Sequence, residues 1–280
     1  MRLNGNRVEH WFFDCGLLAH KVEGEPPTMH FQNTRIRSFS IYGCIYTYAE
    51  ENNLEYERYA IDLILDLFNC SILNIELEID GVPEKHRPFL LGSRQCKNLE
   101  ILGEEVLEAA ELRRTLQILK FQNLRLCIPI PLDFSYPVEN WNRLDSFVNQ
   151  CSSAWITGEI FLALKADFIF LRRSSLTTDD CRRFVERWVN SSNNDFTILQ
   201  IHWAERIPED LNYDNLGIEL LDVDPSREDT FYPDRRETLT WHSKLTFPIV
   251  GGKDMVRADG VQATINILHN HFHIGVRKEN

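Results

Sequence analysis

Seven cysteines recur along the chain at intervals of 29, 26, 26, 31, 24 and 30 residues, the period of proteins built from repeated strand-and-helix units. Three of them, Cys70, Cys96 and Cys151, are followed by an apolar residue three positions on and an isoleucine five positions on. Leu116 and Phe196 open the same pattern with another apolar residue in first place. Because its last two apolar residues are two apart, they share one face of a strand, and each occurrence predicts one buried strand.

The recurrence predicts an α/β fold, an irregular leucine-rich-repeat-like arc of parallel strands and helices with an antiparallel C-terminal β cap. The helical side is expected from apolar residues at helical spacing over residues 59–68, 104–114 and 144–148. The cap is expected over residues 245–276, with a hairpin joined through Asp259 and Gly260.

One helix has clear start and face signals. It is predicted to begin at Thr177 or Thr178, with Asp179 and Asp180 in the first turn, where carboxylates complement the helix dipole. Its apolar face repeats at helical spacing and comprises Cys181, Phe184, Val185, Trp188 and Val189. The strand that follows is expected over residues 196–203, and Trp188 and Trp203 are interpreted as core residues.

Charge and cysteine usage limit the classes of partner. With 30 basic and 42 acidic side chains, the net charge of −12 predicts repulsion of nucleic acids and anionic membranes. The most apolar stretch, residues 160–171, is interrupted by Lys165 and Asp167 and is too short to span a bilayer, and residues 1–8 show no secretory signal. An odd number of cysteines without a Cys-x-x-Cys pair predicts free, mostly buried thiols and a location in the cytoplasm or nucleus.

The search for catalytic chemistry yields one candidate. No nucleophile elbow, zinc-protease or dinucleotide motif occurs, and residues 251–254 are interpreted as a turn rather than a phosphate loop. His269, His271 and His273 alternate, so a strand would place the three imidazoles on one face, where they could bind a metal or face solvent. Solvent is the preferred interpretation; a metal-dependent hydrolase is kept as an alternative, and no cofactor is expected.

Two segments resemble the type-2 F-box-associated domain of nematode-type F-box proteins. The first reads Leu-Thr-Thr-Asp-Asp-Cys-Arg-Arg-Phe-Val-Glu-Arg-Trp over residues 176–188 and continues into the strand that starts at Phe196. The second, residues 254–265, contains Arg-Ala-Asp-Gly-Val-Gln-Ala-Thr-Ile from Arg257 onward. Cys181 and Arg182 depart from the family, which often has Leu and Asn there. The likeness extends loosely over residues 40–276, and its motifs are structural.

The resemblance implies a substrate-recognition module of cullin-RING (SCF) ubiquitin ligases, not an enzyme. Its partners would be one or more protein targets, together with a Skp-type adaptor and a cullin if a longer form carries an F-box. No F-box is recognisable in residues 1–22, so residues 1–40 are expected to be a segment downstream of one, and residues 41–280 the associated domain. A stand-alone protein-interaction module without ligase coupling is the alternative.

Recognition is assigned to strand positions between the buried ones, which would face a partner across the concave side of the arc. These positions are Asn74, Glu76, Glu100, Lys120, Gln200 and His202. For each residue alone, simple solvation is the slightly preferred role.

Overall fold

The computed structural model describes residues 10–13, 28–31, 34–41, 44–49, 72–80, 95–192, 196–223, 230–231, 247–248 and 252–277. The chain divides into two compact units, residues 1–99 with 114–121 and residues 100–113 with 122–280. The predicted helix over residues 59–68 lies outside the described residues, and the predicted boundary at residue 40 stays a prediction.

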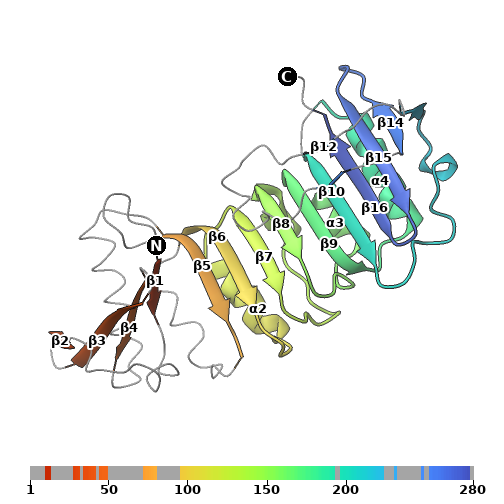
Figure 1. The fold of residues 1–280 in the computed structure, drawn as a ribbon. Helices are drawn as coiled ribbons and strands as arrows, with labels where there is room; N and C mark the ends of the chain where they lie inside the picture. The colour runs from red at the N-terminus through yellow and green to blue at the C-terminus, as the bar shows by residue number, and fades with distance from the viewer. Residues whose placement is uncertain are drawn as a thin grey trace. The chain divides into compact units, whose positions relative to one another are not determined.

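The first unit contains a four-stranded sheet with the order β1-β4-β3-β2 (Figure 1). Its strands are β1 (His10–Phe13), β2 (Thr28–Phe31), β3 (Thr34–Ile41) and β4 (Cys44–Ala49). β1 pairs with β4 in parallel, whereas β3 is antiparallel to both β2 and β4.

A ten-stranded, mostly parallel sheet has the order β11-β14-β15-β16-β10-β9-β8-β7-β6-β5. The strands at its β5 end are β5 (Ile72–Glu78), β6 (Cys96–Leu102), β7 (Asn123–Cys127), β8 (Ser146–Asn149), β9 (Phe168–Ser174) and β10 (Ile198–Trp203). The remaining strands are β11 (Leu221–Asp222), β14 (Lys253–Val256), β15 (Gln262–Leu268) and β16 (His271–Val276). A separate pair joins β12 (Thr230–Phe231) to β13 (Phe247–Pro248).

The sheet changes character at β10. The pairs β7–β8, β8–β9 and β9–β10 are parallel. β10 pairs with β16 in the antiparallel sense, and β16–β15, β15–β14 and β14–β11 continue in that sense. The expected parallel strands and antiparallel C-terminal β-structure are therefore present.

Three α-helices are described, α2 (Ala109–Ile118), α3 (Gly158–Ala163) and α4 (Thr178–Val189), with the 3-10 turns η2 (Val138–Arg143) and η3 (Asp214–Leu216). α4 begins as its sequence predicts: the Thr177 hydroxyl accepts from the Asp180 amide at 3.3 Å, and the Asp180 carboxylate accepts from the Thr177 amide at 2.9 Å. This capping box satisfies two amides of the first turn. The apolar side of α4 is buried as predicted, through Cys181, Phe184, Val185 and Trp188.

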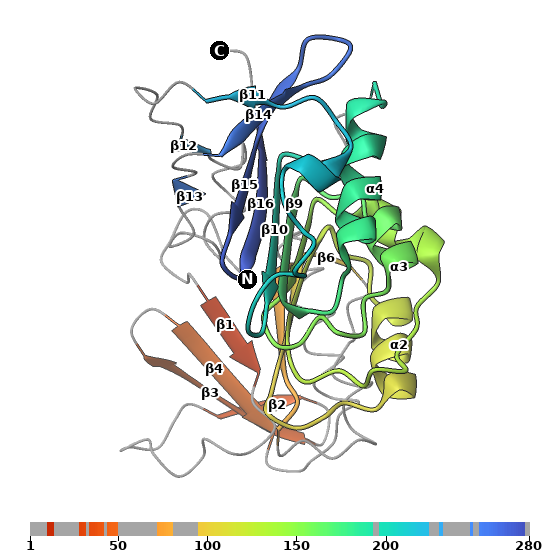
Figure 2. The same ribbon diagram turned by 90° about the vertical axis from the view of Figure 1, so that its right-hand side faces the viewer.

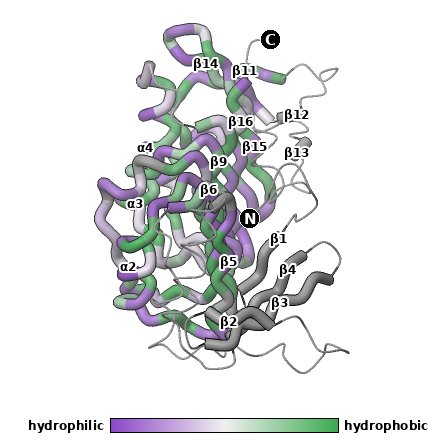
Figure 3. Tube along the Cα trace, turned by 90° about the vertical axis from the view of Figure 1, so that its left-hand side faces the viewer, coloured by the Kyte–Doolittle hydropathy of each residue, from purple (hydrophilic) through white to green (hydrophobic). Residues whose placement is uncertain are grey.

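Helices α3 and α4 lie on one side of the strands of the second unit (Figure 2). Directly after β14, the guanidinium carbon of Arg257 lies 5.4 Å from the ring centroid of Trp188 in α4, and Met255, two residues earlier, shares that side of the strand. The strand registers extend this face through residues whose exposure is almost zero: Ala263, Ile274, Leu199, Ile169 and Phe147. This apolar layer is the core. On each strand, the residues between these core positions point to the opposite face of the sheet, away from α3 and α4. Hydrophilic and hydrophobic residues are interspersed along the strands (Figure 3).

Several predicted boundaries are wrong. Leu116 and Leu119 do not open a strand, because α2 runs to Ile118 and the next strand begins at Asn123. Cys151 follows β8 instead of preceding a strand, and the expected helix over residues 144–148 is this strand. Phe147 and Val148 point to opposite faces of β8 and both are buried. Their sequence therefore lacks the alternation of apolar and polar residues that would indicate a strand. The helix predicted over residues 104–114 begins later, at Ala109.

The C-terminal hairpin turns where the sequence predicts. Gly260 adopts φ 88°, a left-handed conformation that glycine adopts without strain, and its amide donates to the Arg257 carbonyl at 2.9 Å. The Asp259 carboxylate accepts two hydrogen bonds from Arg257, at 2.8 and 2.5 Å, and one from the Val261 amide at 3.2 Å. The Arg-x-Asp-Gly segment is therefore a structural turn motif.

Candidate functional site

The face of the second unit turned away from α3 and α4, called the distal face below, carries side chains in three cross-strand rows. The first row joins Phe168 on β9, Ile198 on β10 and Gly275 on β16. The second row joins Phe170, Gln200, His273 and Asn266, and the third joins Arg172, His202, His271 and Leu268. On β9 and β10 the first row is therefore apolar, and polar residues gather toward the carboxyl ends of these two strands.

A buried apolar cluster joins Phe168 and Ile198 of the first row to Phe170 of the second row and its partner Val148 on β8. Val148, Phe168, Phe170 and Ile198 are all buried and form one hydrophobic group. Toward β14 the first row ends in a bonded network, in which Arg277 donates to Asp254 at 2.5 Å and to Thr264 at 2.9 Å. Thr264 also donates to Asp254 at 2.7 Å, so the buried Thr264 hydroxyl and Asp254 carboxylate both have partners.

Across β6, β7 and β8 the distal face is bonded from strand to strand. Arg125 lies 2.8 Å from the Glu100 carboxylate and donates to the Gln150 side chain at 2.9 Å. The Cys127 thiol lies 3.4 Å from the same Gln150 oxygen. Burial raises the pKa of Cys127 to about 11, although Arg125 opposes this, so the thiol is protonated at neutral pH. Glu100 is therefore neutralised by Arg125 on its own face.

The imidazoles of His202, His271 and His273 form a cluster between β10 and β16. The Nε2 atoms of His202 and His273 are 3.4 Å apart, and the ring centroids of His202 and His271 are 3.9 Å apart. Burial lowers the pKa of His202 to about 3, with further lowering by His271, His273 and Arg172. Burial and then His271 lower the pKa of His273 to about 4. The free protein therefore holds these imidazoles neutral at neutral pH.

A β-bulge at the end of β9 places Arg172 beside this cluster and Arg173 next to it in the chain. His202 is opposite Arg172, but the next residue, Trp203, is opposite Ser174, which leaves Arg173 as the extra residue. Arg173 has φ 52°, a left-handed conformation that is uncommon for a side chain of this size. Both arginines are exposed, and both lower the pKa of Cys151, which burial otherwise raises. Their guanidinium groups therefore lie near the same thiol.

The six residues predicted to recognise a partner fall into two groups. Asn74, Glu76 and Lys120 are exposed and belong to the first unit, and the Asn74 side chain accepts from Asn98 at 2.5 Å. Glu100, Gln200 and His202 share the distal face of the second unit. The prediction that Glu100 and Gln200 are exposed is wrong, since their exposures are 7% and 1%. Cross-strand neighbours on this face bury side chains that alternation alone would assign to solvent.

The histidine pattern is only partly correct. His271 and His273 share one face of β16, but His269 is exposed and precedes the strand, and His202 completes the cluster from β10 instead. The expectation that these histidines face solvent is wrong for His271 and His273, which are half-buried. Among the described residues, no three histidine, cysteine or acidic side chains are arranged to hold a metal ion.

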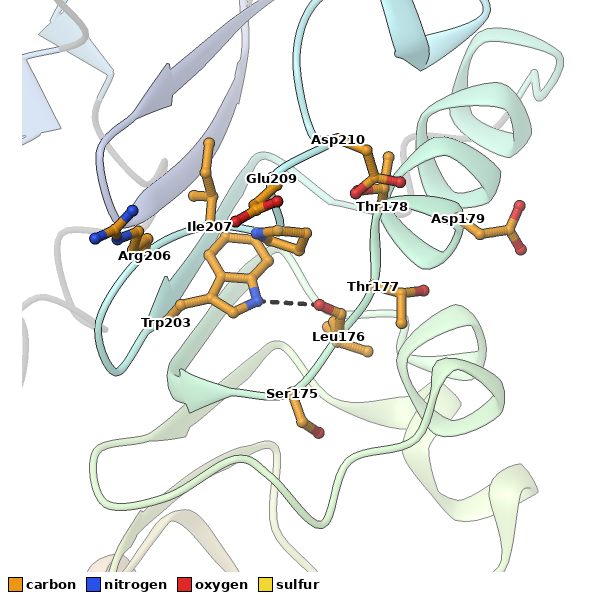
Figure 4. A pocket seen from close by; sticks show the side chains of 11 residues that line it. Ser175, Leu176, Thr177, Thr178, Asp179, Trp203, Arg206, Ile207, Glu209 and Asp210 are labelled. Carbon is orange, nitrogen blue, oxygen red and sulfur yellow. Dashed lines mark hydrogen bonds between the residues drawn. The ribbon is translucent and has the colours of Figure 1, made fainter.

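A pocket of about 560 Å³ lies at the carboxyl ends of β9 and β10, beside the start of α4 (Figure 4). Its floor is Trp203, whose indole donates to the Leu176 carbonyl at 3.0 Å, as the dashed line in Figure 4 shows. Thr178 donates to Asp210 at 2.5 Å, and Thr177 is used in the helix cap. These polar groups hold the loop to the helix, and the predicted core role of Trp203 is confirmed.

Arg172, Arg173 and the bulge were not predicted as functional. In the sequence they are two adjacent basic residues at the end of an apolar strand of an acidic chain. Spacing alone does not distinguish such a pair from basic residues that only contact water at a strand end. The comparisons with protein families, curated proteins and solved structures return no match for this chain. Within the described residues, no helix has the length and apolar character needed to cross a membrane.

Proposed function

We propose that this chain is a protein-recognition module and that the polar part of the distal face binds its target. The observation that carries the proposal is the third row, where Arg172, His202 and His271 present polar groups from three adjacent strands at half-buried or exposed positions. Rows of side chains on neighbouring strands are the surfaces with which strand-and-helix repeat proteins bind other proteins. The proposal includes a leucine-rich-repeat-like arc as the arrangement of the strands and helices that carry this face.

The proposal includes ligase coupling through the resemblance to F-box-associated domains. In that role the chain is a substrate-recognition part of a cullin-RING ubiquitin ligase, in the cytoplasm or the nucleus. The four cysteines whose state is described are free thiols, which supports a reducing compartment. A module without ligase coupling uses the same face and differs only in lacking the Skp-type adaptor and cullin as partners.

Quantitative affinity capture tests the recognition surface. The full chain and its Arg172→Glu variant serve as baits beside Arg183→Glu, a matched charge reversal at an exposed position of α4. We expect specific targets to be lost with Arg172→Glu and kept with Arg183→Glu, because only the former alters the distal face. Targets retained by Arg172→Glu and also by substitutions at the other distal-face residues would argue against this surface.

Ligase coupling is tested separately. Capture from the cells that express the protein would show a Skp-type adaptor and a cullin in amounts comparable with the target if the chain, or a longer form of it, acts in a ubiquitin ligase. Targets captured without either ligase subunit would instead favour the stand-alone module.

A further inference from the structure

We infer that Arg172, Arg173, His202 and His271 bind carboxylate groups of an acidic Asp/Glu segment in the partner protein. The inference rests on the proposed function and names the chemistry of the target at the same face. Its basis is a group of side chains that can all carry positive charge and that no carboxylate of the described residues balances.

The arginines are available for such a partner. Arg172 donates to the Gln150 carbonyl only at the long distance of 3.5 Å. Arg173 makes no hydrogen bond or ion pair with the residues that the structure describes, and both side chains are exposed. Although the net charge of the chain is −12, neither of these adjacent arginines has an acidic partner among the residues that the structure describes. Bulges commonly re-aim a side chain at functional sites.

The charged surroundings of His202 are all of one sign. The groups that act on it are Arg172 from β9 and His271 and His273 from β16, and none of the described acidic residues is among them. Its other cross-strand and ring neighbours, such as Phe170, are uncharged. An imidazolium here would lack a counter-charge, and a bound carboxylate supplies one. Binding therefore favours proton uptake by the imidazoles.

The same face already shows how a carboxylate is held. Glu100 lies 2.8 Å from Arg125 and is shared between neighbouring strands. Arginine pairs well with planar carboxylates because two N–H groups can donate in parallel. Arg172 and Arg173 offer the same chemistry toward the carboxyl end of β9, without an acidic residue of the described chain in place.

The test uses the full chain and a soluble peptide of alternating glutamate and glycine residues. The histidine Cε1–H signals are followed by nuclear magnetic resonance at pH 6, with His202 and His271 assigned from their Gln variants. We expect saturable shifts at these two signals and a raised pKa for both imidazoles in the bound state. In the Arg172→Gln/Arg173→Gln double variant, affinity is expected to fall about tenfold or more, because charge-assisted bonds are lost. Arg183→Gln is the matched control and should bind as the parent does.

The possible results distinguish failure of the carboxylate-binding inference from failure of the proposed protein-recognition function. No shift at millimolar peptide, or an equal affinity in the double arginine variant, overturns the inference. Binding of a phosphoserine peptide but not the glutamate peptide overturns the choice of carboxylate. If captured targets depend on Gln150 or His202 yet ignore both arginines, the inference fails and the proposed function stands. If the capture of targets depends on no residue of the distal face, the proposed function fails.

Discussion

The guanidinium carbon of Arg257 lies 5.4 Å from the ring centroid of Trp188 and joins the two segments that resemble the F-box-associated domain. Arg257 belongs to the C-terminal hairpin segment and Trp188 to helix α4, about seventy residues earlier in the chain. Both are buried, with Arg257 held by Asp259. The two sequence motifs thus form one structural contact, which holds the hairpin against α4.

Trp188→Ala is expected to lower the free energy of unfolding by roughly 3 to 5 kcal/mol, the usual cost of truncating a buried large aromatic residue. The variant also removes the ring beneath Arg257, so a buried charge loses one of its contacts. Chemical denaturation of the parent and variant measures the difference. A nearly unchanged midpoint would contradict burial of this ring.

Thr177→Ala tests the start of α4. Removing the hydroxyl breaks the hydrogen bond to the Asp180 amide, and loss of such a cap costs about 1 kcal/mol. Arg183→Ala, an exposed change in the same helix, should alter the free energy of unfolding by no more than about 0.5 kcal/mol. Equal effects of the two changes in urea denaturation would show that the cap does not stabilise the helix.

Glu76→Lys and Glu100→Lys should differ in stability. Glu76 is exposed, so its reversal should change the free energy of unfolding by about 0.5 kcal/mol or less. Glu100→Lys places a second positive charge against Arg125 at a buried position, and breaking such a pair costs roughly 3 kcal/mol or more. Thermal denaturation compares them, and similar melting temperatures would refute burial of the Glu100 pair.

Stability should fall as the pH drops below about 6.5, the value for a histidine in an unfolded chain. The folded protein holds the pKa of His202 at about 3 and that of His273 at about 4, so between these values and 6.5 the unfolded chain binds more protons. His202→Gln and His273→Gln should each flatten the profile, whereas His269→Gln, at an exposed position, is the control. Denaturation midpoints from pH 7 to pH 5 measure the slope, and identical slopes in all four proteins would contradict the buried cluster.

Thiol reactivity should follow burial. Among the four cysteines whose burial is described, Cys151 is half-buried beside two arginines and should react first with a thiol reagent, followed by Cys127, while Cys96 and Cys181 are buried and should react only on unfolding. Cys151→Ser should remove the fastest phase contributed by these four thiols. In denaturant without reductant, fewer than about five reactive thiols among the seven cysteines would contradict the reduced state.

Local signals were sufficient for α4 and the last hairpin. Thr177, the acidic first turn and the apolar face agree on one helix, and Asp259-Gly260 specifies one turn. They were insufficient around β8, because its cysteine follows the strand and its apolar residues are buried on both faces. A repeat pattern centred on cysteine therefore found strands β5, β6 and β10 and misplaced two others.

The site was less predictable than the fold. Alternation correctly placed Glu100, Gln200 and His202 on one face, but exposure depends on neighbouring strands, which a single strand's sequence does not report. His202 meets His271 only because β10 pairs with β16, seventy residues later in the chain. The bulge at Arg173 also arises from pairing, since its extra residue is defined only against β10.

The change of strand direction at β10 has a consequence for how such a chain can lengthen by duplication. A further strand-and-helix unit needs a parallel neighbour, and β10 already pairs with β9 on one side and with the hairpin strand β16 on the other. Duplicated units could be accommodated before β10, among the parallel strands, but not after it without displacing β16. Variation in the number of parallel strands among descendants of this sequence is therefore expected on the N-terminal side of residue 198, with β10, β14, β15 and β16 inherited as one block.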